Sequence, residues 1–500
     1  MTDTATLSRP DQQSAVEHFD VLIVGAGISG IGAAHHLADQ CPDRSFVILE
    51  AQESFGGTWL THKYPGIRSD SDLYTFGYRF KPWVGPPIAT AEEILAYMGE
   101  VIAEEGLGRH IRYGHKITAA RWSSKDALWT VAGRRTDTGE PVCFTAGFLW
   151  MCQGYYRHEE GYTPEWPGME AFKGRVVHTQ TWPSDLELKD KSVIVIGSGA
   201  TAATLVPAIA GDCGHVTMLQ RSPTYFIPAR NVNELADTLR ELDVDPAWLH
   251  EIVRRKLLHD QANLTRRSFE EPETLREELL AGVRAYLPEE QVQAHFMPSY
   301  RPWRQRIAFI PDGDLFEGVA AGKASVVTDE IERFDKTGIR LKSGARLDAD
   351  IVVTATGFNL SVLGDIAFEV DGKPVDFPQT VTWRGMMFTG VPNLAWVFGY
   401  FRASWTLRVD IMGDLVCRML NEMKAKGAKV VEAKLRPEDE GMERLPWIDP
   451  ENFNPGYLMR AMHLMPKRGP KPEWQHTQNY WAEAQELPKI DFEKDGLVFS

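Results

Sequence analysis

Two glycine-rich turns, each lying between a short apolar run and a helical pattern, constrain the fold of this 500-residue chain more than any other feature. The first turn, Gly25-Ala26-Gly27-Ile28-Ser29-Gly30, follows an apolar run at 19–24 and leads into a helical pattern that extends to Gln40. A second apolar run, at 46–49, ends in the acidic residue Glu50. The order strand, glycine turn, helix, strand and acid is typical of a βαβ unit that binds a dinucleotide.

The residues of this first turn have distinct physical roles. Gly25 allows the tight turn, Gly27 lets the backbone approach a pyrophosphate, and Gly30 lets the helix pack closely on the strand. The helix N-terminus offers free N–H groups and partial positive charge to the phosphates, while Glu50 accepts hydrogen bonds from ribose hydroxyls. The Ser29 hydroxyl, in the first helical turn, suits either a helix cap or a phosphate contact, and the two are compatible.

The second turn has the same pattern with two changes. An apolar run at 192–196 precedes Gly197-Ser198-Gly199-Ala200-Thr201-Ala202, in which Ala202 takes the place of the third glycine, a permitted variant. The next apolar run, at 216–219, ends in Gln220-Arg221-Ser222 instead of an acid. Arg221 and the Ser222 hydroxyl can bind a 2′-phosphate that a carboxylate would repel, so NADP is favoured over NAD. The competing interpretation of Arg221 is a solvated surface arginine.

The rest of the chain divides around these two units. Charged, helix-rich sequence follows the second unit, and short apolar runs return near 325–327, 339–341 and 350–354. The C-terminal section has no glycine fingerprint of its own, so we expect it to complete the first domain. The sequence predicts an α/β protein with two Rossmann-like dinucleotide-binding domains. The predicted segments are 1–150 and 355–500 for the first domain, 151–224 and 306–354 for the second, and 225–305 for a helical insertion in the second.

Composition argues against several other functions. The formal net charge of −15 disfavours nucleic acid as a partner, because its phosphates would be repelled. Five scattered cysteines include no C-x-x-C pair, which disfavours disulfide-reductase chemistry and favours a reduced, cytoplasmic protein. The 14 histidines show no metal-ligand spacing, so no metal site is predicted.

The sequence also bears on membranes. Residues 1–18 lack an apolar stretch and therefore a secretory signal. The apolar stretch at 192–211 is better interpreted as strand, turn and helix than as a membrane span. Peripheral membrane contact and the oligomeric state are left open by the sequence.

Three segments resemble motifs of class B flavoprotein monooxygenases. The first lies between the two glycine turns, Phe172-x-Gly174-x-x-x-His178-x-x-x-Trp182-Pro183, and its final Trp-Pro pair resembles the Baeyer–Villiger branch of that class. The second runs from Gly56-Gly57-Thr58-Trp59 to Tyr64-Pro65-Gly66-Ile67-Arg68-Ser69-Asp70, and the third is Ala355-Thr356-Gly357. The resemblance covers the chain from about 19 to 480, and within the family it points to the ethionamide-activating monooxygenases.

This resemblance implies FAD in the first domain and NADPH in the second. Besides the glycines of the first turn, it carries FAD contacts onto residues spread over the first domain: Ser29, Glu50, Thr58, Trp59, Leu60, Asp70 and Ile117. It carries NADP contacts onto Arg68, near the nicotinamide, and onto the second turn and the strand after it: Gly197, Ser198, Gly199, Ala200, Thr201, Ala202, Ala203, Arg221 and Ser222.

The resemblance also places the catalytic arginine of the family at Arg306, with Asp70 beside it. A fixed guanidinium would stabilise the negative charge of a C4a-peroxyflavin and of the adduct that follows. Asp70 would orient Arg306 and tune it electrostatically. The alternative interpretation of Arg306 is a simple ion pair between domains. Many family members have a lysine for the 2′-phosphate where this chain has Gln305, so NADP selectivity would depend on Arg221, or Arg304 would substitute.

The function implied is NADPH- and O2-dependent Baeyer–Villiger oxidation of a ketone to an ester or lactone. The alternative is S- or N-oxygenation of thioethers, thioamides or amines by the same intermediate. Rivals from other classes are a flavin reductase that passes electrons to a protein or quinone, and a nucleotide-binding scaffold without turnover. His178 is expected to serve as a hydrogen-bonding hinge. Four aromatic residues either line an apolar substrate pocket or belong to the core: Trp383, Phe398, Phe401 and Trp405.

Overall fold

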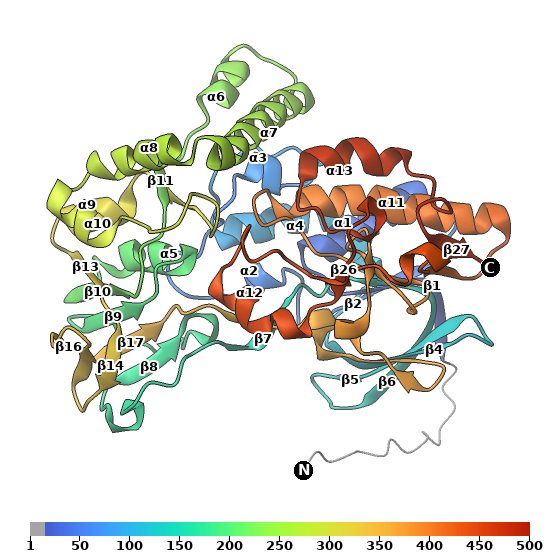
Figure 1. The fold of residues 1–500 in the computed structure, drawn as a ribbon, viewed down its shortest axis with the longest axis horizontal. Helices are drawn as coiled ribbons and strands as arrows, with labels where there is room; N and C mark the ends of the chain where they lie inside the picture. Colours follow the sequence, from blue (N-terminus) through green and yellow to red (C-terminus); the bar gives the residue numbers. More distant parts are fainter. Residues whose placement is uncertain (1–15) are drawn as a thin grey trace.

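The computed structural model describes residues 16–500. The sequence predicts no secretory signal in residues 1–18, and residues 1–15 of that segment lie outside the described range. The described chain forms two separate β-sheets with helices packed against them, and each glycine turn follows a strand of a different sheet (Figure 1). The predicted α/β fold with two Rossmann-like domains is therefore confirmed.

The larger sheet, on the right of Figure 1, takes strands from both ends of the chain. Its order is β20-β19-β4-β5-β6-β1-β2-β3, with β23 paired to β6. Strands β6, β1, β2 and β3 are parallel, as a dinucleotide-binding sheet requires. The strands are β1 (Glu17–Val24), β2 (Phe46–Leu49), β3 (Ile111–Arg112), β4 (His115–Ser123), β5 (Leu128–Arg135), β6 (Pro141–Met151), β19 (Ala367–Val370), β20 (Lys373–Pro374) and β23 (Leu394–Trp396).

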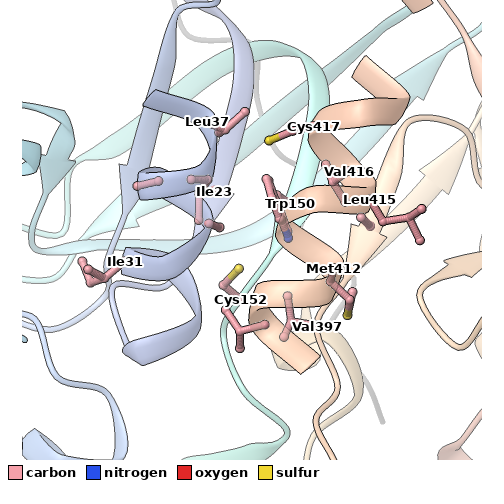
Figure 2. Packing of buried hydrophobic residues seen from close by; sticks show 14 of the residues in the cluster. Ile23, Ile31, Leu37, Trp150, Cys152, Val397, Met412, Leu415, Val416 and Cys417 are labelled. Atoms are coloured by element: carbon pink, nitrogen blue, oxygen red, sulfur yellow. The ribbon is translucent and has the colours of Figure 1, made fainter. Parts of the chain in front are cut away.

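Two helices from opposite ends of the chain pack together on this sheet. They are α1 (Ile28–Gln40) and α11 (Trp405–Lys426), and Figure 2 shows Leu37 of α1 pointing toward Cys417 of α11, both of which belong to the same hydrophobic core. Glycines allow the close approach: a Cβ on Gly32 would lie 2.8 Å from Val409 Cγ1, and one on Gly413 would lie 2.3 Å from His36 Cδ2. The C-terminal section therefore completes the first domain in space, although its exact boundaries stay a prediction.

The smaller sheet, on the left of Figure 1, is entirely parallel, in the order β13-β10-β9-β17-β8. Its strands carry apolar runs that are buried on both faces, as is typical of parallel sheets: helices cover one face, and apolar residues of segment 334–341 cover the other. The elements are β8 (Arg175–His178), β9 (Ser192–Ile196), β10 (His215–Gln220), β13 (Ala324–Thr328), β17 (Ile351–Thr354), and the helices α5 (Ala200–Ile209) and α10 (Asp314–Ala320).

The predicted helical insertion contains α6 (Glu234–Glu241), α7 (Pro246–Glu270), α8 (Pro272–Arg284) and α9 (Glu289–His295). It does not pack on the second domain alone. Leu249 and Val253 of α7 belong to the core of the first domain, whereas Leu280 and Val283 of α8 belong to the core of the second. The insertion therefore packs against both domains, which its periodicity in the sequence does not reveal.

The remaining elements are shorter. The helices are α2 (Thr58–Thr61), α3 (Leu73–Phe76), α4 (Ala91–Glu104), α12 (Gly456–Ala461) and α13 (Tyr480–Glu486). The strands are β7 (Tyr156–Gly161), β11 (Phe226–Ala229), β12 (Ala308–Pro311), β14 (Ile331–Phe334), β15 (Gly338–Leu341), β16 (Arg346–Asp348), β18 (Phe358–Leu360), β21 (Thr382–Trp383), β22 (Met387–Phe388), β24 (Val431–Ala433), β25 (Leu445–Pro446), β26 (Lys467–Arg468) and β27 (Leu497–Phe499). Across residues 16–500, no helix is both long and apolar enough to cross a bilayer.

Candidate active site

Both glycine turns open into one cavity of about 1290 Å³. The cavity lies at the C-terminal ends of β1 and β9, where ligands bind in sheets of this type. Most of the predicted site residues line it: Gly25, Gly27, Ser29, Glu50, Thr58, Trp59, Arg68, Asp70, Ile117, Gly197, Ser198, Gly199, Ala200, Thr201, Arg221, Ser222 and Arg306. Gly30, Leu60, Ala202 and Ala203 are not part of its wall.

The first glycine turn is built as its sequence predicts. Gly25 has φ +100°, and a Cβ there would lie 2.8 Å from the carbonyl oxygen of Cys152. A Cβ on Gly30 would lie only 1.9 Å from Gly25 O, which explains why Gly30 lies behind the cavity wall and packs helix against strand. Gly27 faces Gly57 of the next loop, and α1 begins with no side-chain cap and no acidic residue in its first turn. Its free N–H groups therefore remain available to an anion.

Glu50 is buried and also holds the first turn in shape. Its two carboxylate oxygens accept hydrogen bonds from the backbone N–H of Ala26, at 2.7 Å, and of Gln52, at 2.8 Å. Burial raises the pKa of Glu50, and these backbone donors act in the opposite direction. The carboxylate thus braces the turn and still lines the cavity, where its remaining lone pairs can accept ribose hydroxyls.

Two other predicted contacts in the first domain have additional partners. The Ser29 hydroxyl accepts a hydrogen bond from Trp405 Nε1 at 2.8 Å, which ties α1 to α11 at the cavity. Leu60 lies in α2 with its Cβ and backbone N close to Gly56, and it is not part of the cavity wall.

The second glycine turn repeats the geometry of the first. Gly197 has φ +145°, and a Cβ there would lie 2.4 Å from Ala355 O. A Cβ on Gly199 would meet nothing within 4 Å, and α5 begins without a side-chain cap or an acidic residue in its first turn. Ala202 and Ala203 are buried in α5, where small side chains let the helix lie close to β9. This end of the cavity also fits a pyrophosphate.

Arg68 is engaged with an acidic residue of the second domain. Its guanidinium donates to both oxygens of Asp314, at 2.5 and 3.1 Å, and Asp314 begins α10. Arg68 still lines the cavity, so the pair connects the cavity wall of the first domain to the second.

Arg306 and Asp70 meet at the centre of the cavity wall. Arg306 Nε lies 2.5 Å from Asp70 Oδ2, and Arg306 Nη2 donates to Asp70 Oδ1 at 2.8 Å. Arg306 Nη1 also donates to the carbonyl oxygen of Phe401 at 3.3 Å. Burial disfavours the charge on Arg306, but the Asp70 carboxylate outweighs it, so the pKa of Arg306 is raised. The guanidinium is a permanent, oriented cation beside the cavity.

Three tyrosines beside Arg306 were not predicted from the sequence. The hydroxyls of Tyr155 and Tyr156 lie 2.6 Å apart, the ring of Tyr457 lies 5.9 Å from that of Tyr156, and all three line the cavity. Burial raises the pKa of each phenol, so all three are protonated hydrogen-bond donors at neutral pH. The only sequence signal for Tyr155 and Tyr156 was their position directly after an apolar run that ends in Gly154.

His178 is the last residue of β8, at the edge of the smaller sheet, and lies outside the cavity wall. Its Nδ1 accepts from the backbone N–H of Gln180 at 3.0 Å, and its Nε2 lies 3.1 Å from the carbonyl oxygen of Gly357, to which it donates. Burial lowers the pKa of His178, which keeps the ring neutral with both nitrogens engaged. These contacts favour the role of a hydrogen-bonded link.

The four aromatic residues left open by the sequence divide into two groups. Phe401 and Trp405 line the cavity, whereas Trp383 and Phe398 are fully buried core residues. Gln305 lines the cavity, but Arg304 is not part of its wall and pairs with Glu451 at 3.1 Å. In this arrangement Arg304 is not part of the surface that a cofactor in the cavity would contact. No group of three His, Cys, Asp or Glu side chains within residues 16–500 is arranged to hold a metal ion.

The comparisons with known proteins agree with this geometry. Residues 23–84 match the NAD(P)-binding Rossmann-like domain, and residues 83–234 match the flavin-binding monooxygenase-like family. The chain is 45% identical over 493 residues to the FAD-containing monooxygenase EthA of Mycobacterium tuberculosis, covering 97% of this chain and 98% of that protein. It is 42% identical over 481 residues to the probable FAD-binding monooxygenase AlmA of an Acinetobacter species, covering 96% and 95%.

Solved structures share the fold at lower identity. An oxidized steroid monooxygenase bound to NADP superposes with a TM-score of 0.76 at 23% identity, over 96% of this chain and 99% of that one. Cyclohexanone monooxygenase from Rhodococcus sp. Phi1 bound to NADP+ gives a TM-score of 0.72 at 20% identity, over 97% and 100%.

A cavity between two dinucleotide-binding domains, with both helix N-termini opening into it, defines a flavin-dependent oxidoreductase. The chain belongs to the flavin-binding monooxygenase family, with FAD-containing monooxygenases such as EthA and AlmA among its relatives. Of the predicted cofactors, FAD is the one that the relatives' names give, and NADP is bound in the solved structures that share the fold.

Proposed function

We propose that this monooxygenase uses NADPH and O2 to carry out the Baeyer–Villiger oxidation of a ketone to an ester or lactone. The observation that carries the proposal is the Arg306–Asp70 pair, which holds a cation at the cavity wall between the two glycine turns. A flavin-dependent reductase has no need of such a cation, because electron transfer to an acceptor leaves no anionic oxygen adduct to stabilise.

The first turn and the loop after it would hold FAD. The N-terminus of α1 would bind the pyrophosphate, Glu50 the ribose, and Thr58, Trp59 and Ile117 would lie along the rest of the cofactor. Bound FAD, reduced by NADPH, would supply the activation of O2. The second turn with Arg221 and Ser222 would hold NADPH, while Arg68 would be placed near its nicotinamide.

Arg306 would stabilise negative charge electrostatically and would not transfer a proton. Its guanidinium remains protonated under all conditions relevant to the enzyme, since Asp70 raises a pKa that is already high. Negative charge that develops on oxygen during attack on a carbonyl would be stabilised by this fixed cation without reorganisation of solvent. The phenols of Tyr155, Tyr156 and Tyr457 would donate hydrogen bonds on the same side of the cavity.

The second candidate function is oxygenation of sulfur or nitrogen in thioethers, thioamides or amines. The 45% identity to EthA over nearly the whole chain favours this candidate, because the ethionamide-activating group to which the sequence points oxidises sulfur. The Trp182-Pro183 pair favours the ketone reaction, and the same cation can serve both. The two activities differ in product, so one experiment separates them.

The test is oxygen labelling with the purified flavoprotein. NADPH and isotopically labelled dioxygen are supplied with a cyclic ketone, a linear ketone and an aryl thioether, and the products are analysed by mass spectrometry. Label in a lactone or ester supports the proposal, and label only in a sulfoxide selects the second candidate. A third outcome is that NADPH is consumed with all three substrates and hydrogen peroxide is the sole oxygen product. That outcome would contradict both candidate functions for these substrate classes.

A further inference from the structure

Two arginines from distant parts of the chain, Arg221 and Arg460, line the same cavity. Arg221 follows β10 in the second domain, and Arg460 belongs to α12 in the C-terminal section. Neither forms a salt bridge or a side-chain hydrogen bond with any residue of the described range 16–500. They lie close enough to affect each other: burial, and then the charge of Arg221, lowers the pKa of Arg460.

Arg460 is positioned by stacking instead of by an acid. Its guanidinium carbon lies 3.5 Å from the ring centroid of Tyr162, a cation–π contact that leaves the N–H groups of the guanidinium free in its plane. Its Nη2 would lie 3.7 Å from a Cβ on Gly357, the glycine of the Ala355-Thr356-Gly357 turn. Gly357 has φ +98° and no side chain, so the space between this turn and Arg460 stays open.

Of the nearby acidic residues, Glu330 forms an ion pair with a lysine and Asp329 accepts hydrogen bonds from backbone N–H groups. Asp329 and Glu330 line this side of the cavity, and the charge of Arg221 contributes to a lowered pKa of Glu330, although Lys342 contributes more. Lys342 Nζ lies 2.6 Å from Glu330 Oε2, and Asp329 Oδ1 accepts from the backbone N–H of Glu330 at 2.7 Å. The two guanidiniums repel each other, and the acids nearby have other partners. The pair therefore forms a site for a multiply charged anion.

The chain lacks positive charge where its family often places it. Gln305 is neutral, and Arg304 is held by Glu451 away from the cavity wall. Arg221 alone would then face the 2′-phosphate that distinguishes NADP from NAD.

We propose that Arg460 and Arg221 together bind the 2′-phosphate of NADP(H), and that Arg460 supplies the positive charge that is absent at position 305. This inference rests on the proposed use of NADPH. It assigns the choice between NADP and NAD partly to the C-terminal section of the first domain rather than to the second domain alone.

The test compares affinities, without turnover. Dissociation constants of NADP+ and NAD+ are measured by calorimetry on the FAD-loaded wild type, Arg460→Ala, Arg460→Lys and the control Arg304→Ala. We expect Arg460→Ala to weaken NADP+ binding about tenfold or more and to leave NAD+ binding unchanged, because a charge-assisted phosphate contact is lost. Arg460→Lys should retain part of the affinity for NADP+, and Arg304→Ala should leave both affinities unchanged.

Three results would overturn the inference. Arg460→Ala could bind NADP+ as tightly as the wild type, or lose affinity for NADP+ and NAD+ equally, which would make Arg460 a general wall residue. A wild type that binds NAD+ as tightly as NADP+ would overturn both this inference and the proposed use of NADPH. In the first two cases the wild type still prefers NADP+, so a failure of Arg460 is distinguishable from a failure of the proposed function.

Discussion

The side chains of Arg306 and Asp70 form a bidentate pair, with Nε 2.5 Å from Oδ2 and Nη2 2.8 Å from Oδ1, although 236 positions separate them in the chain. Asp70 lies in the loop between α2 and α3 of the first domain, and Arg306 follows the helical insertion. A bidentate contact fixes both the position and the plane of the guanidinium. The orientation of the cation in the active site therefore depends on segments from both domains.

Replacing Arg306 by alanine should separate the two halves of the reaction. Reduction of the bound flavin by NADPH should persist, while formation of oxygenated product should fall by about 10²–10³, the usual loss when one stabilising donor is removed. Stopped-flow bleaching under nitrogen measures the first, and product analysis measures the second. Arg304→Ala is the matched control, since Arg304 pairs with Glu451 outside the cavity wall. Normal ester or sulfoxide output from the Arg306 variant would remove Arg306 from the mechanism.

Asp70→Asn should retain the cation and loosen its position. Without the carboxylate, Arg306 keeps its charge but loses its bidentate partner, so kcat should fall about tenfold to a hundredfold through misplacement of the guanidinium. Asp70→Glu should recover part of kcat, and KM for NADPH should change little in either variant. Steady-state kinetics gives the split between kcat and KM. Equal kcat in the wild type and the Asn variant would show that Asp70 does not position Arg306.

The two fingerprint glycines Gly30 and Gly199 should respond in opposite ways to alanine. A Cβ on Gly30 would clash with Gly25 O at 1.9 Å, so Gly30→Ala should unfold the first turn and yield protein without flavin. A Cβ on Gly199 meets nothing within 4 Å, so Gly199→Ala should keep its flavin and its thermal midpoint while NADP+ binds more weakly. Flavin absorbance, thermal unfolding and NADP+ calorimetry measure these outcomes. A stable, yellow Gly30→Ala protein would contradict the packing described for the first turn.

His36 should make stability depend on alkaline pH. It lies on α1 between Asp410 and Asp414 of α11, with ring nitrogens 3.6 and 3.3 Å from their carboxylates. Burial would lower the pKa of His36, but the two carboxylates outweigh it and raise the pKa to about 9. The pKa of His36 in the folded protein lies above its ordinary value of 6.5. The stabilisation of the folded state by protonated His36 is therefore complete below pH 6.5 and is lost as the pH rises through about 9.

The protonated His36 stabilises the folded state by at most about 3.5 kcal/mol, at roughly 1.4 kcal/mol for each unit by which its pKa is raised. The measurement is the thermal midpoint of the wild type and of His36→Gln across this pH window, with the exposed His463→Gln as control. The gap between wild type and His36→Gln should close at alkaline pH, and the control should follow the wild type. A gap that stays constant from neutral to alkaline pH would contradict the assigned charge of His36.

Much of the fold was predictable because local patterns determine it. The apolar runs at 46–49 and 192–196 are strands with those bounds, and both glycine turns join a strand to a helix as their spacing predicts. The glycines are informative because their roles are steric: only glycine fits at Gly25 and Gly30. The clash of a Cβ on Gly30 with Gly25 O and the positive φ of Gly25 arise within the turn itself, so sequence patterns report them directly, whereas the close approach of Gly25 to Cys152 is a tertiary contact.

The rest of the site depends on contacts that no local pattern encodes. Arg306 and Asp70 were found through resemblance to a family, not through spacing. Tyr457 and Arg460 lie on a helix of six residues with no recognisable motif, and they reach the cavity only because the C-terminal section packs there. The contact of α7 with the first domain also arises from tertiary packing, since amphipathic periodicity indicates a buried face but not its partner.

The first sheet has a consequence for how the protein is made. Strands β19 and β23 pair with β4 and β6, and α11 covers α1, so β4, β6 and α1 each gain one of their neighbours only after about three-quarters or more of the chain has been synthesised. Until then, part of the first domain's apolar surface lacks its native cover on the ribosome, a situation in which chaperones are commonly needed. Flavin capture should accordingly be a late event in biosynthesis, and a fragment ending before residue 367 should not form a stable flavin domain.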